Sequence, residues 1–145
     1  MKSNLYVMCG IPGSGKTTIA HNFSDIVISS DEVRKSLYGD ASIQCNAKLV
    51  FQIVDELVLK SLQNKNVVYD ATSISPKVRK RIIDKFKDKA NIIGVYVNTS
   101  LDICISRNNN RERVVPESVI RKMYSNFTIP TLEEGFSKII EIKNN

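Results

Sequence analysis

Short apolar runs alternate along the chain with longer stretches in which apolar residues recur at three- and four-residue spacing. The runs predict buried strands over residues 5–9, 26–29, 66–70, 92–97 and 139–142. The helical spacing is clearest from 42 to 63. Further helices are predicted at 17–23, at 30–38 with Ser30 or Asp31 as the cap, from Pro76 onward, and around 100–108 and 116–126.

This alternation predicts an α/β fold, with a parallel sheet flanked by helices on both faces. With 145 residues, the chain is expected to form a single domain, 1–145, around one core. Ligands of such sheets bind at the carboxyl ends of the strands. Polar side chains that directly follow a strand are therefore the first candidates for a functional site.

A glycine-rich loop joins the first predicted strand to the first predicted helix, and it fits the phosphate-binding pattern Gly-x-x-x-x-Gly-Lys-Thr. Its glycines let successive backbone N–H groups turn toward anionic oxygens. The Lys should reach the terminal phosphates of ATP, and the Thr hydroxyl should bind Mg²⁺. An ordinary glycine turn is the alternative, but it does not require Lys and Thr at these offsets. The residues predicted to hold ATP here are Pro12, Gly13, Ser14, Gly15, Lys16, Thr17 and Thr18.

Asp31 and Arg34 follow the second predicted strand and are three residues apart at a helix start, so they share one face. Beside the phosphate loop, the carboxylate could accept the proton of an attacking hydroxyl group. The arginine could hold a phosphate through two hydrogen bonds. A helix cap with an exposed salt bridge is the alternative, and the nearby strand end and phosphate loop favour the catalytic interpretation.

Asp70 ends the third predicted strand, where phosphate-loop enzymes place a carboxylate for Mg²⁺ or its water shell. Ala71 and Thr72 follow it, so the acidic pair typical of ATP-driven motors is missing. Arg107 and Arg111 are four residues apart in a predicted lid segment, and both are predicted to bind ATP. For Asp70 the alternative is a purely structural carboxylate. For Arg107 and Arg111 the alternative is a solvated basic loop.

The net charge of +6 arises from residues 71–145, which contain 14 basic and 8 acidic side chains. A basic second half of the chain suits a polyanionic partner, either a nucleotide or a nucleic acid. A solvated basic surface explains this modest excess of positive charge equally well. The helix that begins at Pro76 concentrates this charge. A solvated face is the simpler interpretation of it, and contact with a nucleic-acid backbone is the alternative. Its basic residues are Lys77, Arg79, Lys80, Arg81, Lys85, Lys87 and Lys89.

No apolar run approaches the roughly 18 residues of a membrane span. Three scattered cysteines, Cys9, Cys45 and Cys104, favour reduced thiols over a disulfide framework or a zinc site. These features predict a cytoplasmic protein without membrane association.

Taken together, the motifs resemble the kinase domain of the phage-type 5′-hydroxyl polynucleotide kinases, within the P-loop kinase superfamily. Very many proteins share the phosphate loop, whereas Asp-x-x-Arg and Arg-x-x-x-Arg in this order are more specific. The resemblance extends through nearly the whole chain, and it rests on residues 10–18, 30–34, 69–72, 107–111, 115–124 and 130–136.

The resemblance implies ATP- and Mg²⁺-dependent phosphorylation of the 5′-hydroxyl ends of DNA or RNA, a reaction of nucleic-acid repair. It implies that Lys16 and Thr17 hold phosphates and Mg²⁺, and that Asp31 is the general base. Arg111 would be the catalytic lid arginine over the ATP phosphates, with Arg107 in support.

On the acceptor side, the resemblance implies that Arg34 grips the phosphate on the 3′ side of the acceptor nucleoside. Asp70 and Thr72 would help to order the acceptor site. A homo-oligomer is also compatible with the resemblance, because phage-type relatives assemble.

Two other functions stay open at this point. A P-loop kinase that acts on a small molecule or on charged tRNA would share every residue on the ATP side. A nucleotide-dependent switch without phosphoryl transfer is the other alternative, but the guanine-reading Asn-Lys-x-Asp signature is missing. Residues 64–67 come closest to it and lack the Asp.

Overall fold

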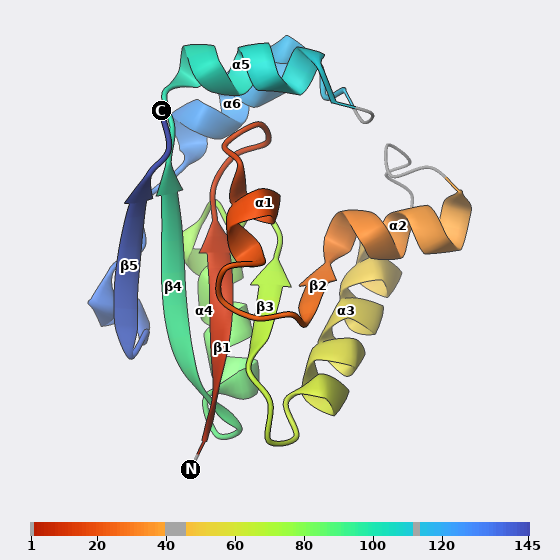
Figure 1. Cartoon of the computed structure of the whole chain (residues 1–145), viewed down its shortest axis with the longest axis vertical. Helices are drawn as coiled ribbons and strands as arrows, with labels where there is room; N and C mark the ends of the chain where they lie inside the picture. Colours follow the sequence, from red (N-terminus) through yellow and green to blue (C-terminus); the bar gives the residue numbers. More distant parts are fainter. Residues whose placement is uncertain (1, 40–45, 112–113) are drawn as a thin grey trace.

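A five-stranded parallel sheet forms the centre of the computed structural model, which describes residues 2–39, 46–111 and 114–145. All neighbouring strand pairs run parallel in the spatial order β2-β3-β1-β4-β5, so their carboxyl ends lie along one edge (Figure 1). The predicted fold class and the five predicted strands are confirmed. The strands are β1 (Ser3–Cys9), β2 (Val27–Ser29), β3 (Val67–Asp70), β4 (Ala90–Asn98) and β5 (Lys138–Lys143).

Helices cover both faces of the sheet and the carboxyl ends of its strands. In Figure 1, α1 lies in front of the sheet, α3 and α4 lie behind it, and α5 and α6 lie above the strand ends. Within the described residues, no helix combines the length and apolar character needed to cross a bilayer. The helices are α1 (Lys16–Ala20), α2 (Ser30–Tyr38), α3 (Ala47–Ser61), α4 (Pro76–Phe86), α5 (Leu101–Asn109), α6 (Glu117–Asn126) and the 3₁₀ turn η1 (Leu132–Glu134).

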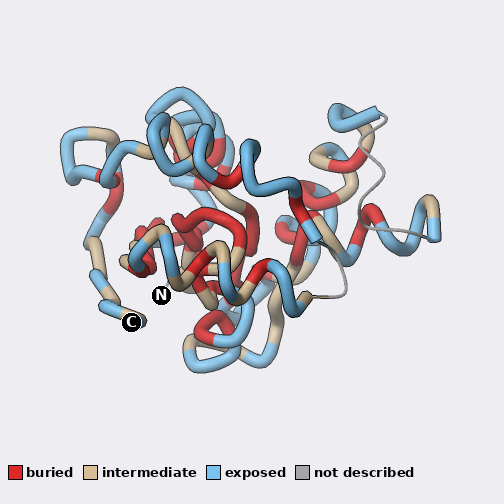
Figure 2. Tube along the Cα trace, turned by 90° about the horizontal axis from the view of Figure 1, so that it is seen from above, coloured by how far each residue is buried: buried red, intermediate tan, exposed pale blue. Residues whose placement is uncertain are grey.

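The two faces of the sheet have separate apolar cores because side chains alternate along each strand. Val7 and Cys9 of β1 belong to the larger core, with residues from α3 and α4 such as Val54 and Phe86. Met8, between them, faces the smaller core beneath α1. The buried positions therefore concentrate along the sheet and on the inner sides of the helices (Figure 2).

Helix ends differ from the sequence expectation in three places. The cap of α2 is Ser29, whose hydroxyl accepts the Glu32 N–H at 3.4 Å. The prediction of Ser30 or Asp31 was wrong because β2 runs directly into α2, so the last strand residue is the one with extended backbone. The first helix ends at Ala20, three residues earlier than predicted. The predicted start of α3 at residue 42 lies outside the described residues, and the described helix begins after Asn46.

Candidate active site

The glycine-rich loop leaves the carboxyl end of β1 and is closely packed by the chain that follows β3 and by α5. The Gly10 N–H donates to the Thr72 carbonyl at 3.0 Å, which fixes the start of the loop beside β3. Gly13 and Gly15 have φ values of 85° and 92°, a region that favours glycine. A side chain at Gly13 would also collide with the Cys104 carbonyl. Glycine is thus required here both by the turn and by the close approach of α5.

Three side chains from distant segments bind one carbonyl of this loop. The Ser14 carbonyl accepts hydrogen bonds from Thr99 Oγ1 at 2.8 Å, from Asn144 Nδ2 at 2.8 Å and from Arg107 Nη1 at 3.3 Å. This contact ties the loop to the ends of β4 and β5 and to α5. Sequence reasoning missed Thr99 and Asn144, because neither belongs to a recognisable motif. It did single out Arg107, which the structure places against the loop backbone.

Thr17 and Asp70 form the part of the site that suits a cation. Thr17 Oγ1 donates to Asp70 Oδ2 at 2.9 Å. Asp70 Oδ1 is buried and has no hydrogen-bond partner among the described residues, and a carboxylate oxygen in that state needs a cation or a bound water. Mg²⁺ typically takes one or two protein oxygens and completes its shell with water and phosphate oxygens. The Thr17 hydroxyl and the unpartnered Asp70 oxygen fit such a phosphate-bound Mg²⁺. Among the described residues there is no group of three or more His, Cys, Asp or Glu side chains that could hold a metal ion.

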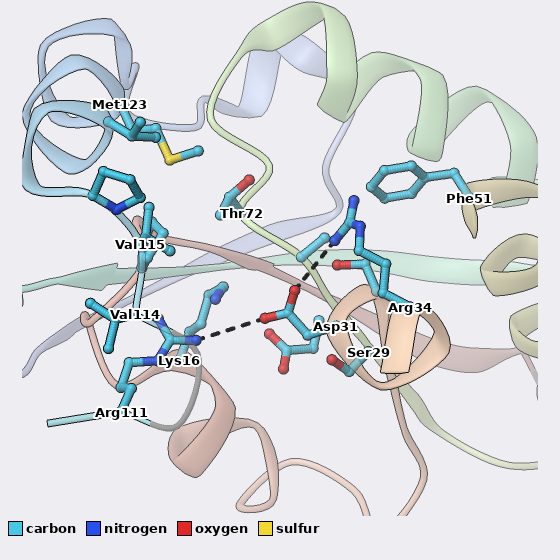
Figure 3. A pocket seen from close by; sticks show the side chains of 16 residues that line it. Lys16, Ser29, Asp31, Arg34, Phe51, Thr72, Arg111, Val114, Val115 and Met123 are labelled. Atoms are coloured by element: carbon cyan, nitrogen blue, oxygen red, sulfur yellow. Dashed lines mark hydrogen bonds and ion pairs between the residues drawn. The ribbon is translucent and has the colours of Figure 1, made fainter. Parts of the chain in front are cut away.

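Asp31 lies between two arginines at the mouth of the site (Figure 3). Arg34 Nη1 is 3.3 Å from one of its carboxylate oxygens, and Arg111 Nη2 is 3.7 Å from the other. Arg34 is only 7% exposed, and its Nε has no partner among the described residues. A buried donor without a partner is unfavourable, so an anion bound in the crevice beside Arg34 would stabilise its guanidinium group.

A single crevice of about 480 Å³ brings most of the predicted residues together. Lys16, Asp70 and Thr72 line it from the phosphate-loop side, and Asp31 and Arg34 line it from α2. Other predicted residues do not line this crevice, and two of them, Thr17 and Thr18, are exposed on α1; these residues are Gly13, Ser14, Gly15, Thr17, Thr18 and Arg107. The opposite wall is apolar, and sequence reasoning did not identify it. This wall contains Val114, Val115, Pro116, Val119 and Met123.

The basic helix predicted from Pro76 is α4, and several of its charges are neutralised within the fold. Arg79 is fully buried and binds Glu134, with Nε 2.6 Å from Oε1. Arg81 and Lys85 both pair with the buried Asp55, at 2.9 and 3.2 Å. The solvated-face interpretation is therefore wrong for Arg79. Its partner is 55 residues away in the sequence, which is why local charge counting could not reveal the pair.

The two described cysteines are buried and free, as predicted, and Cys45 lies outside the described residues. Burial raises the pKa of the Cys9 thiol to about 12 and that of Cys104 to about 11. Both thiols stay protonated near neutral pH and are poor nucleophiles. The chemistry of the crevice thus depends on its carboxylates, its cations and the loop backbone.

The family model described as AAA domain (AAA_33) matches residues 5–130. The chain is 25% identical to the L-seryl-tRNA(Sec) kinase of Methanococcus maripaludis, over 87% of this chain and 53% of that protein. It is 27% identical to the bifunctional polynucleotide phosphatase/kinase of Schizosaccharomyces pombe, over 95% of this chain and 33% of that protein. The chain thus spans about half of the first relative and a third of the second. The chain is 26% identical to the adenylyl-sulfate kinase of Buchnera aphidicola, over 99% of this chain and 75% of that protein.

Solved structures share the fold. The structure of the Pnkp1/Rnl/Hen1 RNA repair complex contains a chain that matches with a TM-score of 0.74 and 19% identity, over 86% of this chain and 44% of that chain. A putative kinase from Chloroflexus aurantiacus matches with a TM-score of 0.76 and 14% identity, over 99% of this chain and 89% of that chain. At these identities the likeness establishes the arrangement of strands and helices and leaves the acceptor open.

Proposed function

The chain belongs to the AAA domain family and is a P-loop kinase, and we propose that it phosphorylates the 5′-hydroxyl ends of DNA or RNA strands with ATP as donor. The observation that carries this proposal is the position of Asp31. Its carboxylate lies in the same crevice as Lys16 of the phosphate loop and between two arginines that suit phosphates on either side of a hydroxyl group.

In the proposed reaction, Asp31 accepts the proton of the 5′-hydroxyl group as the oxygen attacks the γ-phosphorus of ATP. The new O–P bond forms while the bond from the γ-phosphorus to the β,γ-bridging oxygen breaks, and ADP leaves. Lys16 and Arg111 neutralise charge on the transferring group. Mg²⁺ on Thr17 and Asp70 would add a further positive charge at the phosphates. Positioning and charge neutralisation therefore account for most of the rate.

The acceptor side of the crevice supports a nucleotide. Arg34 offers a buried guanidinium for the phosphate on the 3′ side of the acceptor, and the valine and methionine wall opposite offers an apolar surface for a base. The polynucleotide phosphatase/kinase among the relatives is in keeping with this acceptor. Nucleic-acid 5′ ends would then be the partner of this protein, as substrate.

A second candidate is a kinase of charged tRNA or of a small molecule, because the relatives also include an L-seryl-tRNA(Sec) kinase and an adenylyl-sulfate kinase. These acceptors would use the same Lys16, Thr17 and Asp31. They would differ in what Arg34 and the apolar wall contact.

The test is transfer of label from γ-labelled ATP, with Mg²⁺, to a 5′-hydroxyl oligonucleotide beside a 5′-phosphorylated control strand. Label that enters only the 5′-hydroxyl strand supports the proposal. Parallel reactions with seryl-tRNA and with adenylyl sulfate separate the alternatives. Transfer to either of these, with none to the oligonucleotide, overturns the polynucleotide acceptor and retains the kinase.

A further inference from the structure

Phe51 of α3 lines the crevice beyond Arg34 as seen from Asp31 (Figure 3). It lines the same cavity as Lys16, Asp31 and Arg34. Figure 3 shows Arg34 between Asp31 and the Phe51 ring, so the side chains follow one another from the loop outward.

A second arginine, Arg81, also lies beside the ring. The guanidinium carbon of Arg81 is 5.9 Å from the centroid of the Phe51 ring, within the range of a cation–π contact. The Arg81 side chain is 45% exposed, so it also faces solvent. The Phe51 ring therefore has the Arg81 cation beside it, and Arg34 lies next to it in the crevice (Figure 3).

Buried groups hold Arg81 in this position. Its Nη1 donates to Asp55 Oδ2 at 2.9 Å and its Nη2 to the Tyr69 hydroxyl at 3.2 Å. Tyr69 in turn donates to Asp55 Oδ1 at 2.9 Å. Burial raises the pKa of Tyr69, and Asp55 adds to the rise, so the hydroxyl stays protonated and keeps donating. The arrangement around the ring is thus fixed before an acceptor arrives.

An aromatic ring next to an arginine in a crevice suits a nucleic-acid strand, in which bases alternate with phosphates. Aromatic side chains bind bases by stacking, and arginines beside them bind the backbone. We propose that Phe51 is the stacking surface for the second base of the acceptor strand, with Arg34 at the phosphate before it. This inference rests on the proposed polynucleotide acceptor, and it makes Phe51 the residue that favours strands over mononucleotides.

The experiment compares the KM of two acceptors, a nucleoside 3′-monophosphate and a trinucleotide, in the wild type and in Phe51→Ala. Only the trinucleotide has a second base. We expect its KM to rise by about 10- to 100-fold in Phe51→Ala, since base stacking on one aromatic side chain has that value. The KM of the mononucleotide should stay within about twofold.

Two further variants separate stacking from a packing defect. Phe51→Leu keeps an apolar side chain at this partly buried position and should lose the preference for the trinucleotide, whereas Phe51→Trp should keep it. Leu59→Ala is the matched control, because it removes an exposed apolar side chain of the same helix that does not line the crevice. It should leave both KM values unchanged.

The outcomes also distinguish this inference from the proposed function. Equal changes for both acceptors, or no change for either, would overturn the role of Phe51 while the enzyme remains a polynucleotide kinase. A wild-type protein that phosphorylates neither acceptor would overturn the polynucleotide function and this inference with it.

Discussion

Among the described residues, two arginine side chains are almost without solvent exposure, and their surroundings are opposite. Arg79 makes five hydrogen bonds, to both carboxylate oxygens of Glu134, to the carbonyl and hydroxyl of Thr128 and to the Ser73 carbonyl. Arg34 makes a 3.3 Å contact with Asp31, and its Nε has no partner among the described residues.

The difference shows how a buried charge can be assigned to the fold or to a ligand. In the buried clamp (Arg79, Thr128 and Glu134), every guanidinium nitrogen has a partner, so the charge stabilises the packing of η1 against α4. In the charged crevice (Asp31, Arg34 and Arg111), a donor is spare and the ion pairs are long. Variants in the clamp should therefore change stability, and variants in the crevice should change activity.

The largest effect is expected from Asp31→Ala. Loss of the general base should lower kcat by about 10²–10⁴-fold while the Kd for ATP stays within a few-fold. Steady-state kinetics and ATP titration measure the two quantities. Glu32→Ala, the exposed neighbour on α2, is the control and should retain activity. Unchanged turnover in Asp31→Ala would remove this residue from the base role.

Arg79→Ala tests the other side of the comparison. It leaves the Glu134 carboxylate and the Thr128 and Ser73 carbonyls without their donor. The free energy of unfolding should fall by about 3–5 kcal/mol, as measured by urea denaturation. The control is Lys80→Ala, one residue along α4, which removes an exposed pair with Asp84 and should cost less than about 1 kcal/mol. Equal stabilities of the two variants would contradict the clamp.

Arg34→Ala tests whether this buried arginine serves a ligand, in contrast to Arg79, which serves the fold. We expect the KM for the acceptor to rise by about 10- to 100-fold, the loss of one charged hydrogen-bonded contact, with little change in the KM for ATP. The midpoint of thermal unfolding should fall by less than it does in Arg79→Ala, because the spare donor contributes nothing to packing. An effect confined to ATP would show that Arg34 serves the donor side.

The smallest effect is a pH dependence in the clamp. Burial, the largest single influence, would raise the pKa of Glu134, but the hydrogen bonds from Arg79 and Thr131 and the charge of Arg79 together outweigh it, so the pKa lies below the ordinary 4.5. The stabilisation is therefore complete above the unfolded pKa and is lost as the pH falls through the folded one. Unfolding curves of wild type and Glu134→Gln should differ most near neutral pH and converge at acidic pH. A stability difference between wild type and Glu134→Gln that grows toward low pH would contradict the lowered pKa of Glu134.

Local sequence patterns predicted the sheet, the order of elements and the charged side of the crevice, because these depend on short-range signals. Apolar runs gave the five strands, and the spacing from Gly10 to Thr17 gave the phosphate loop. Parallel strands bring their carboxyl ends together, so Asp31 and Asp70 were expected in one crevice. The structure has both in its lining.

The remaining features depend on contacts between distant residues. Glu134 follows Arg79 by 55 residues, and Thr99 and Asn144 have no motif that links them to the loop. The sequence pattern also did not predict that Arg107 would contact the backbone of the phosphate loop. Its four-residue spacing from Arg111 suggested a common direction, but α5 ends at Asn109. Arg107 therefore contacts the loop, while Arg111 contacts Asp31.

The hydrogen bond from Asn144 to the Ser14 carbonyl joins residues that are 130 positions apart. Contacts of such sequence separation form late in folding, because a long intervening segment must first be organised. Complete assembly of the phosphate loop therefore awaits the docking of β5 on β4. During refolding, high-affinity binding of a fluorescent ATP analogue should lag behind the recovery of the helical circular dichroism signal. The length of this delay would measure when β5 docks on β4.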